Sequence, residues 1–204
     1  MNRRVYIFVN GILTNPLDTQ GWTDRACRWI DRYTEHKADR FEYLSGAITR
    51  RLFQNARVEK FTEIVSEYVD LDLVLVAHSN GCDIISRFLL KTRLRIKEIH
   101  LIAAACERDF SQNGINAAME AGRLDDCFLY GSKNDKALQL AFNTGKFLRF
   151  FGLGYGTLGL KGPKKVACPL RVHRLSMDEY DHSTWFDPNH FENTMRLITR
   201  GVPK

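Results

Sequence analysis

The hydrophobic pattern of the chain alternates between short apolar runs and longer amphipathic stretches. Apolar runs of about four to eight residues are typical of strands that are buried on both faces of a parallel sheet. Apolar residues at helical spacing predict the helices that separate these strands. The predicted strands are residues 5–9, 39–44, 73–77, 98–105, 126–130 and 170–175. The predicted helices are residues 22–33, 57–69, 81–90, 114–121, 136–151 and 191–199.

Strands that alternate with helices along the whole chain predict an α/β fold. We expect a three-layer α/β/α sandwich with a mostly parallel six-stranded sheet, formed by one domain over residues 1–204. No internal repeat or low-complexity linker divides the chain. In such a sheet the ligand site lies beyond the carboxyl ends of the strands, where the strand order reverses.

A strand, a tight turn and a helix meet at Ser79, within the stretch VLVAHSNGCDIISRFLL of residues 74–90. The apolar run ends in a polar turn, H-S-N-G, and apolar residues at helical spacing follow it. This arrangement is typical of a nucleophile elbow, which lifts a serine hydroxyl above the carboxyl end of its strand. The motif reads A-H-S-N-G, with Ala77 in place of the first glycine of G-x-S-x-G. Ser79 is therefore the candidate nucleophile.

Two further side chains complete the candidate catalytic group. A serine hydroxyl is a weak nucleophile at neutral pH, so it needs a neutral base within reach and a group that orients this base. Asp135 follows the fifth predicted strand in a short polar loop, and His182 follows the sixth in the stretch DEYDHSTWF. The chain order Ser79, Asp135, His182 is the Ser…acid…His order of one fold family.

Other side chains remain candidates for the acid or the base. Glu107 and Asp109 follow the fourth predicted strand, from which an acid can also reach the site. His190 is an alternative to His182 as the base, although it lies beside the last predicted helix. His78 precedes the apex of the turn, so its side chain should point away from the site.

Together, these motifs resemble a compact α/β-hydrolase, a serine hydrolase of the esterase and lipase kind, without the first two strands of larger members. The resemblance covers nearly the whole chain. It includes N-G after the first predicted strand, A-H-S-N-G after the third, G-S-x-x-D after the fifth and D-H-S after the sixth. It implies the minimal fold of that family, with the strand order 2-1-3-4-5-6.

The resemblance also implies which groups bind the substrate. An oxyanion hole would be formed by the backbone N–H groups of Ile12 and Asn80, because the strand order brings the loop after the first strand beside the elbow. Asn10, Gly11 and Leu13 of this loop are the expected substrate-binding residues. Asn10 stands where many members have a histidine, a change that keeps the backbone donors.

The segment of residues 146–165, KFLRFFGLGYGTLGLKGPKK, alternates large apolar residues with glycines. It lies between the candidate acid and the candidate base in the chain, and two interpretations remain open. The segment is either a movable flap that lines the acyl-binding face, or a helix end and loop packed against the sheet. In the first interpretation Tyr155 contacts the substrate.

Composition and charge narrow the classes of partner. The net charge of +6 comes from scattered basic residues without a nucleic-acid-binding motif, so we expect no nucleic-acid partner. Five cysteines form no C-x-x-C pair and no metal-binding spacing, so no metal site is expected, and unpaired thiols suit a reducing compartment. No apolar run is long enough for a signal peptide or a membrane span. We therefore expect a cytoplasmic protein without stable membrane insertion.

These observations predict a carboxylic ester hydrolase that forms an acyl-enzyme intermediate, acts on a small-molecule or lipid-like ester and needs no cofactor. The same triad fits an acyltransferase or an amidase, because the acceptor pocket decides between these reactions. A non-catalytic binding protein with this fold is the alternative from another class. Acyl and alcohol specificity and the oligomeric state stay open.

Overall fold

The computed structural model describes residues 3–11, 21–43, 53–150 and 156–199, and for residues 144–150 it describes the backbone alone. Six strands form one sheet in the order β2-β1-β3-β4-β5-β6, and all neighbouring strands are parallel. The strands are β1 (Arg4–Val9), β2 (Lys37–Phe41), β3 (Asp72–His78), β4 (Ile96–Ile102), β5 (Leu124–Gly131) and β6 (Val172–Ser176). The predicted fold class is confirmed, and the strand order is the expected one.

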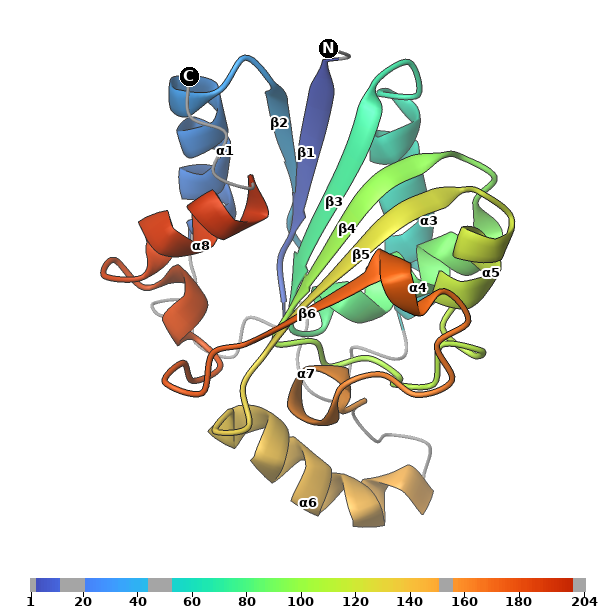
Figure 1. The fold of residues 1–204 in the computed structure, drawn as a ribbon, viewed down its shortest axis with the longest axis vertical. Coiled ribbons are helices and arrows are strands. Elements are labelled where there is room, and N and C mark those ends of the chain that lie inside the picture. Colours follow the sequence, from blue (N-terminus) through green and yellow to red (C-terminus); the bar gives the residue numbers. More distant parts are fainter. Residues whose placement is uncertain (1–2, 12–20, 44–52, 151–155, 200–204) are drawn as a thin grey trace.

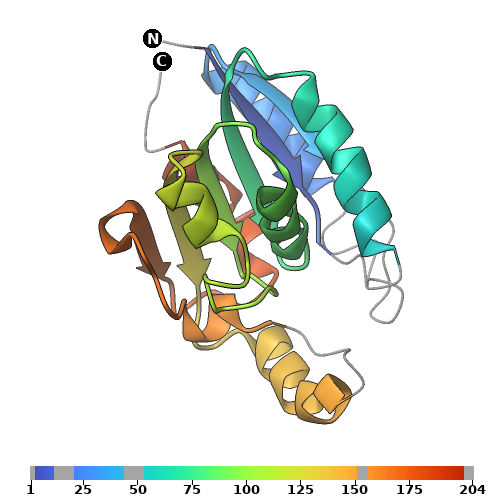
Figure 2. The same ribbon diagram turned by 90° about the vertical axis from the view of Figure 1, so that its right-hand side faces the viewer.

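Helices cover both faces of the sheet, so the molecule has three layers (Figure 1). Helices α1 and α8 lie on one face, and α3, α4 and α5 lie on the other. Helices α6 and α7 lie beyond the carboxyl ends of the strands (Figures 1 and 2). The helices are α1 (Trp22–Tyr33), α3 (Gln54–Ser66), α4 (Gly81–Lys91), α5 (Ile115–Glu120), α6 (Lys136–Phe150), α7 (Leu158–Lys161) and α8 (Phe191–Ile198), with 3-10 turns η1 (Pro169–Arg171) and η2 (Thr184–Phe186).

The interior has two apolar layers, one on each side of the sheet. Val5, Ile7 and Val9 of β1 face the layer shared with α3, α4 and α5. Tyr6 and Phe8 of the same strand face the layer shared with α1 and α8. All five side chains are buried. Residues 5–9 of the strand therefore form an unbroken apolar run, because successive side chains enter opposite layers.

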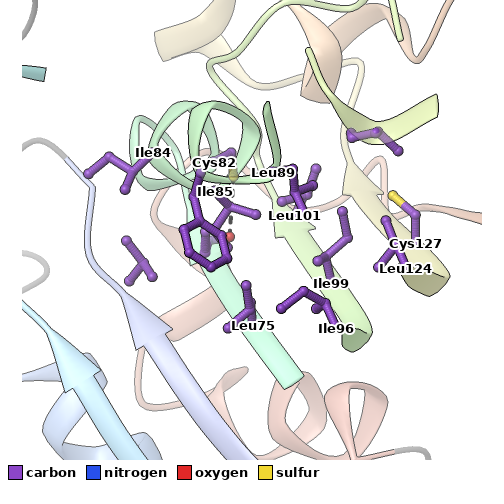
Figure 3. Close-up of a cluster of buried hydrophobic side chains, with 14 of the residues drawn as sticks. Leu75, Cys82, Ile84, Ile85, Leu89, Ile96, Ile99, Leu101, Leu124 and Cys127 are labelled. Atoms are coloured by element: carbon purple, nitrogen blue, oxygen red, sulfur yellow. Dashed lines mark hydrogen bonds between the residues drawn. The ribbon is translucent and has the colours of Figure 1, made fainter. Parts of the chain in front are cut away.

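Figure 3 shows part of the first layer, where α4 lies across the central strands. Ile85 and Leu89 of α4 belong to the same buried cluster as Leu75 of β3 and Leu101 of β4. Full burial of one such side chain stabilises the fold by about 1.5–3 kcal/mol. This packing holds α4 at a fixed height above β3, and so fixes the turn between them.

The two edge strands differ from their predicted positions. Strand β2 begins at Lys37 instead of residue 39, and β6 begins at Val172 instead of residue 170, after the 3-10 turn η1. Both strands are largely half-exposed or exposed along their length. Without burial on both faces they lack the continuous apolar run that made the central strands recognisable.

Strand β4 was also predicted to run further, to residue 105, but it ends at Ile102. Ala103 turns the chain with a φ of 46°, and the following residues contact α7. The N–H group of Gly159 in α7 donates a hydrogen bond to the carbonyl of Ala104 (2.9 Å). The described part of the 146–165 segment thus packs against the strand ends, which favours the second interpretation for this part. Tyr155 lies outside the described residues.

Candidate active site

Ser79 occupies a strained position between β3 and α4. It has a φ of 54°, in the left-handed region that residues other than glycine rarely adopt. Such a conformation costs about 1–3 kcal/mol and persists only where the surroundings hold it. The Ser79 N–H group donates to the carbonyl of Ile102 (2.9 Å), and the Ser79 carbonyl accepts from the N–H group of Ala105 (3.1 Å). The end of β4 thus holds the turn from both sides.

Two glycines allow β1 and the elbow to approach each other closely. A Cβ atom on Gly81 would lie 2.6 Å from the carbonyl oxygen of Asn10 and 2.7 Å from that of Val9. A Cβ atom on Gly11 would lie 3.0 Å from the Cβ atom of Ser79. The start of α4 therefore touches the end of β1. Gly11, the second residue after β1, lies directly beside Ser79, at the point where the strand order reverses.

His182 lies between Ser79 and Asp135. Its Nε2 atom is 2.9 Å from the Oγ atom of Ser79, and its Nδ1 atom is 2.8 Å from Oδ2 of Asp135. A carboxylate oxygen only accepts hydrogen bonds, so the Nδ1–H group of His182 donates to Asp135. The Nε2 atom then carries no hydrogen and accepts a hydrogen bond from the hydroxyl of Ser79. Asp135 is buried, whereas the side chain of His182 is 22% exposed. The site is therefore open to solvent at the histidine, while the acid and Ser79 are buried.

The loop that carries Asp135 is tied to the loop that carries His182. The second carboxylate oxygen of Asp135, Oδ1, accepts the N–H group of Leu138 (2.8 Å) and so caps the first turn of α6. Asp181 bridges the two loops, because its Oδ1 atom accepts the N–H groups of His182 (2.7 Å) and Lys136 (3.1 Å). These bonds hold the acid and the imidazole at a set distance.

His78 lies beneath the imidazole of His182 and contacts its backbone. Its Nε2–H group donates to the carbonyl of His182 (2.8 Å), and the two ring centres are 4.9 Å apart. Burial, and then the charge of His182, lower the pKa of His78 to about 3. His78 is therefore neutral at neutral pH. The expectation that its side chain points away from the site is therefore wrong, because the ring contacts the residue that carries the candidate base.

The alternative acids and bases have other partners. The carboxylate of Glu107 accepts the backbone N–H groups of Arg108 and Asp109. Asp109 pairs with Lys165, and this contact and the Ser111 hydroxyl lower the pKa of Asp109 to about 2. His190 bonds Asp187 at the start of α8 (2.7 Å). None of these three side chains has a hydrogen bond to Ser79 or His182.

Only some of the residues expected to bind the substrate lie in the described part of the chain. The Oδ1 atom of Asn10 accepts the N–H group of Gly11 (2.8 Å) and the indole N–H group of Trp22 (2.9 Å). This buried side chain therefore joins the end of β1 to the start of α1. Asn80 is the first residue before α4, and its side chain donates to the hydroxyl of Tyr43 (3.0 Å). The remaining expected residues, Ile12 and Leu13, lie outside the described residues, as does Tyr155.

An aromatic cluster beside the site was not predicted as part of it. The indole of Trp22 stacks on Phe186 with ring centres 3.8 Å apart, and Phe186 meets the ring of His78 edge-on. Both aromatic residues are buried. Trp22 begins α1 and Phe186 follows the histidine loop, so only the folded chain brings them together. Phe186 is close to His182 in the sequence, and Trp22 bonds Asn10 in the folded chain. Neither residue forms part of a sequence motif that would have predicted this cluster.

The described ranges hold neither a candidate metal site nor a candidate membrane span. There, no group of three or more histidine, cysteine, aspartate or glutamate side chains is arranged to hold a metal ion. Nor does any helix in this part of the chain combine the length and the apolar character needed to cross a membrane.

Comparisons with known proteins rest on structure alone, because no protein-family model and no curated sequence matches the chain. The mouse alpha/beta hydrolase domain-containing protein 10 superposes with a TM-score of 0.59 at 12% identity, covering 96% of this chain and 88% of that one. A protein of the alpha/beta hydrolase superfamily from Xanthomonas campestris gives 0.57 at 13% identity, covering 98% and 97%. A lipase from Bacillus licheniformis gives 0.53 at 13% identity, covering 97% and 92%. The chain thus has an α/β-hydrolase-like fold.

Proposed function

We propose that the protein is a serine hydrolase that cleaves a carboxylic ester through an acyl-enzyme intermediate. The observation that carries the proposal is the continuous hydrogen-bonded series from Ser79 through His182 to Asp135 at a strained turn. A buried structural serine needs neither the strain nor a histidine and a carboxylate aligned behind its hydroxyl. The proposal is supported by the fold, because the nucleophile elbow of α/β-hydrolases also lies at the carboxyl end of a central strand.

In the first half of the reaction, the Oγ atom of Ser79 attacks the ester carbonyl while Nε2 of His182 accepts its proton. Asp135 holds the imidazole by Nδ1–H and stabilises the imidazolium that forms. His182 then gives the proton to the departing alcohol, and the acyl group remains on Ser79. Because Asp135 is buried and fixed by the cap of α6, its orientation does not change between these steps.

The tetrahedral intermediate needs donors for its negative oxygen. We propose that the backbone N–H group of Asn80, at the positive end of α4, supplies one of them. The second donor is proposed to be the N–H group of Ile12, which follows Gly11 in the chain, and Gly11 lies beside Ser79. In the second half of the reaction a water molecule, activated by His182, hydrolyses the acyl-enzyme. The proposed substrate is a small-molecule or lipid-like ester, and no cofactor takes part in these steps.

A fluorophosphonate probe tests the proposal, because it reacts with a serine that is activated in this way. The full chain should be labelled and should hydrolyse p-nitrophenyl acetate or butyrate. Ser79→Ala should lose labelling and at least about 10⁴-fold of the turnover while keeping its circular dichroism spectrum. Ser66→Ala, at an exposed serine of α3, is the matched control and should behave as the wild type.

Labelling by the probe and turnover of the ester together distinguish the competing functions. Absence of labelling in the folded wild type would contradict a catalytic role and favour a binding protein. Labelling without ester turnover would keep Ser79 as the nucleophile but replace hydrolysis of simple esters by amide cleavage or acyl transfer. Labelling that persists in Ser79→Ala would overturn the assignment of the nucleophile.

A further inference from the structure

A cavity apart from the candidate active site lies at the edge of the sheet between β5, β6 and α7, with a volume of about 270 Å³. Figures 1 and 2 show α7 beside the ends of these strands. Its floor includes Leu101 of β4, Leu129 of β5 and Leu158 of α7. The volume is slightly below the roughly 300–1,000 Å³ of pockets that hold drug-sized ligands, so it suits a smaller molecule. None of the catalytic candidates lines it.

The polar part of this cavity is positively charged. Lys133, Lys161 and Arg174 come from three different elements, and the described lining residues include no aspartate or glutamate. Asp178 lies outside the lining, where its carboxylate accepts the hydroxyl of Ser176 (2.9 Å) and the N–H group of Lys133 (3.4 Å). One carboxylate therefore offsets part of the charge of three cations. An anion entering the cavity would meet a net positive field.

Arg174 is an exposed residue that lines the cavity beside the backbone of Gly162. Its guanidinium lies against Gly162, where any side chain would collide with it. Within the described ranges, no carboxylate pairs with Arg174 and no acceptor takes its guanidinium protons. A guanidinium presents five donors in a planar fork that matches a carboxylate or a phosphate. No contact with another described residue therefore competes with a ligand for these donors.

Two carbonyl groups beside the cavity, which would repel an anion, are already bonded. Arg108 donates to the carbonyl of Gly162 (3.1 Å) and to that of Lys161 (3.2 Å), at the negative end of α7. The ammonium group of Lys161 lies 3.5 Å from the centre of the Phe142 ring, which restrains its position. A fourth cation, Arg108, is therefore bonded to two residues of the cavity lining, and their carbonyl groups are occupied.

We propose that this cavity binds a small amphipathic anion, with its carboxylate or phosphate group on Arg174 and a short apolar chain over the leucine floor. The site is separate from Ser79, and it does not depend on the proposed hydrolase activity. An anionic group on a guanidinium contributes charge-assisted hydrogen bonds, each worth about 10- to 100-fold in affinity.

Calorimetric titration of the full chain with hexanoate, hexyl phosphate and neutral hexanamide tests the site. Spectra of ¹⁵N-labelled protein would follow the amide signals of Gly131 and Gly162, which both line the cavity. We expect saturable binding of at least one of the two anions and much weaker binding of hexanamide. Hexanoate and hexyl phosphate distinguish a carboxylate from a phosphate as the preferred head group.

Arg174→Gln should weaken anion binding by about tenfold or more. Arg93→Gln removes the same charge from an exposed arginine that makes no contact with the cavity lining, so its affinity should equal that of the wild type. The proposal is overturned if neither anion saturates, if the two variants lose affinity equally, or if hexanamide binds as well as hexanoate. It is also overturned if the titration leaves the signals of Gly131 and Gly162 unchanged.

Discussion

Replacing His78 by phenylalanine should slow the reaction of Ser79 with little change in the fold. The Nε2–H group of His78 donates to the carbonyl of His182 (2.8 Å), whose side chain is aligned on Ser79. Phenylalanine keeps a flat ring of similar shape but has no donor, so the carbonyl of His182 loses this hydrogen bond. Leaving such a group without its partner costs about 1–3 kcal/mol. If the histidine loop must recover this arrangement to react, the rate falls between about 5-fold and 150-fold.

The rate of fluorophosphonate labelling, measured for the wild type, His78→Phe and His78→Gln, separates this role from packing. The amide of glutamine can place a donor near the position of the histidine Nε2 atom, so His78→Gln should recover much of the rate. Urea unfolding of the same proteins would show whether stability changes in parallel. The reasoning is refuted if His78→Phe reacts at the wild-type rate, or if both variants are equally slow.

Three further predictions follow from the site and its supports. Asp135→Asn should keep the cap of α6 but offer His182 a donor instead of an acceptor. Turnover of p-nitrophenyl butyrate should therefore fall by about 10⁴-fold, and a loss below tenfold would contradict the role of the acid. Gly81→Ala should lower the free energy of unfolding, measured in urea, by about 1–3 kcal/mol, because the new Cβ atom would press on the carbonyl of Asn10. This loss should exceed the gain from the higher helix propensity of alanine. Unchanged stability would contradict the close approach. Because burial lowers the pKa of His78 from 6.5 to about 3, the unfolded chain takes up a proton that the folded chain excludes, so stability should fall as the pH drops through this window. Relative to His78→Gln, the wild type should lose up to tenfold in its folding constant per pH unit below 6.5, and parallel pH curves would contradict the buried neutral state.

The central part of the fold was predictable from the sequence because its signal is local. Strands β1 and β3 are buried on both faces, so each appears as an unbroken apolar run next to a polar turn. The edge strands β2 and β6 are half-exposed, and their apolar residues do not mark their ends. Helix α7 was not predicted, because a helix of one turn has too few residues to show a helical period.

The candidate site was predictable to the extent that strand ends carry its side chains. Asp135 and His182 each follow a strand, and parallel strands bring their carboxyl ends to one edge. The contacts that hold them could not be predicted. Asp181 joins loops that are 45 residues apart, and His78 reaches the carbonyl of His182 across 104 residues. Such contacts depend on loop conformations, which the spacing of residue types does not encode.

Mapping the residue that a fluorophosphonate modifies tests the central claim most directly. The full chain would be reacted with the probe at neutral pH, digested and sequenced by tandem mass spectrometry. The account predicts one modified peptide that contains the AHSNG motif, with the adduct on Ser79 and none after prior unfolding in urea. An adduct on another residue, or labelling that survives unfolding, would contradict the assignment of Ser79 as a nucleophile activated by His182 and Asp135.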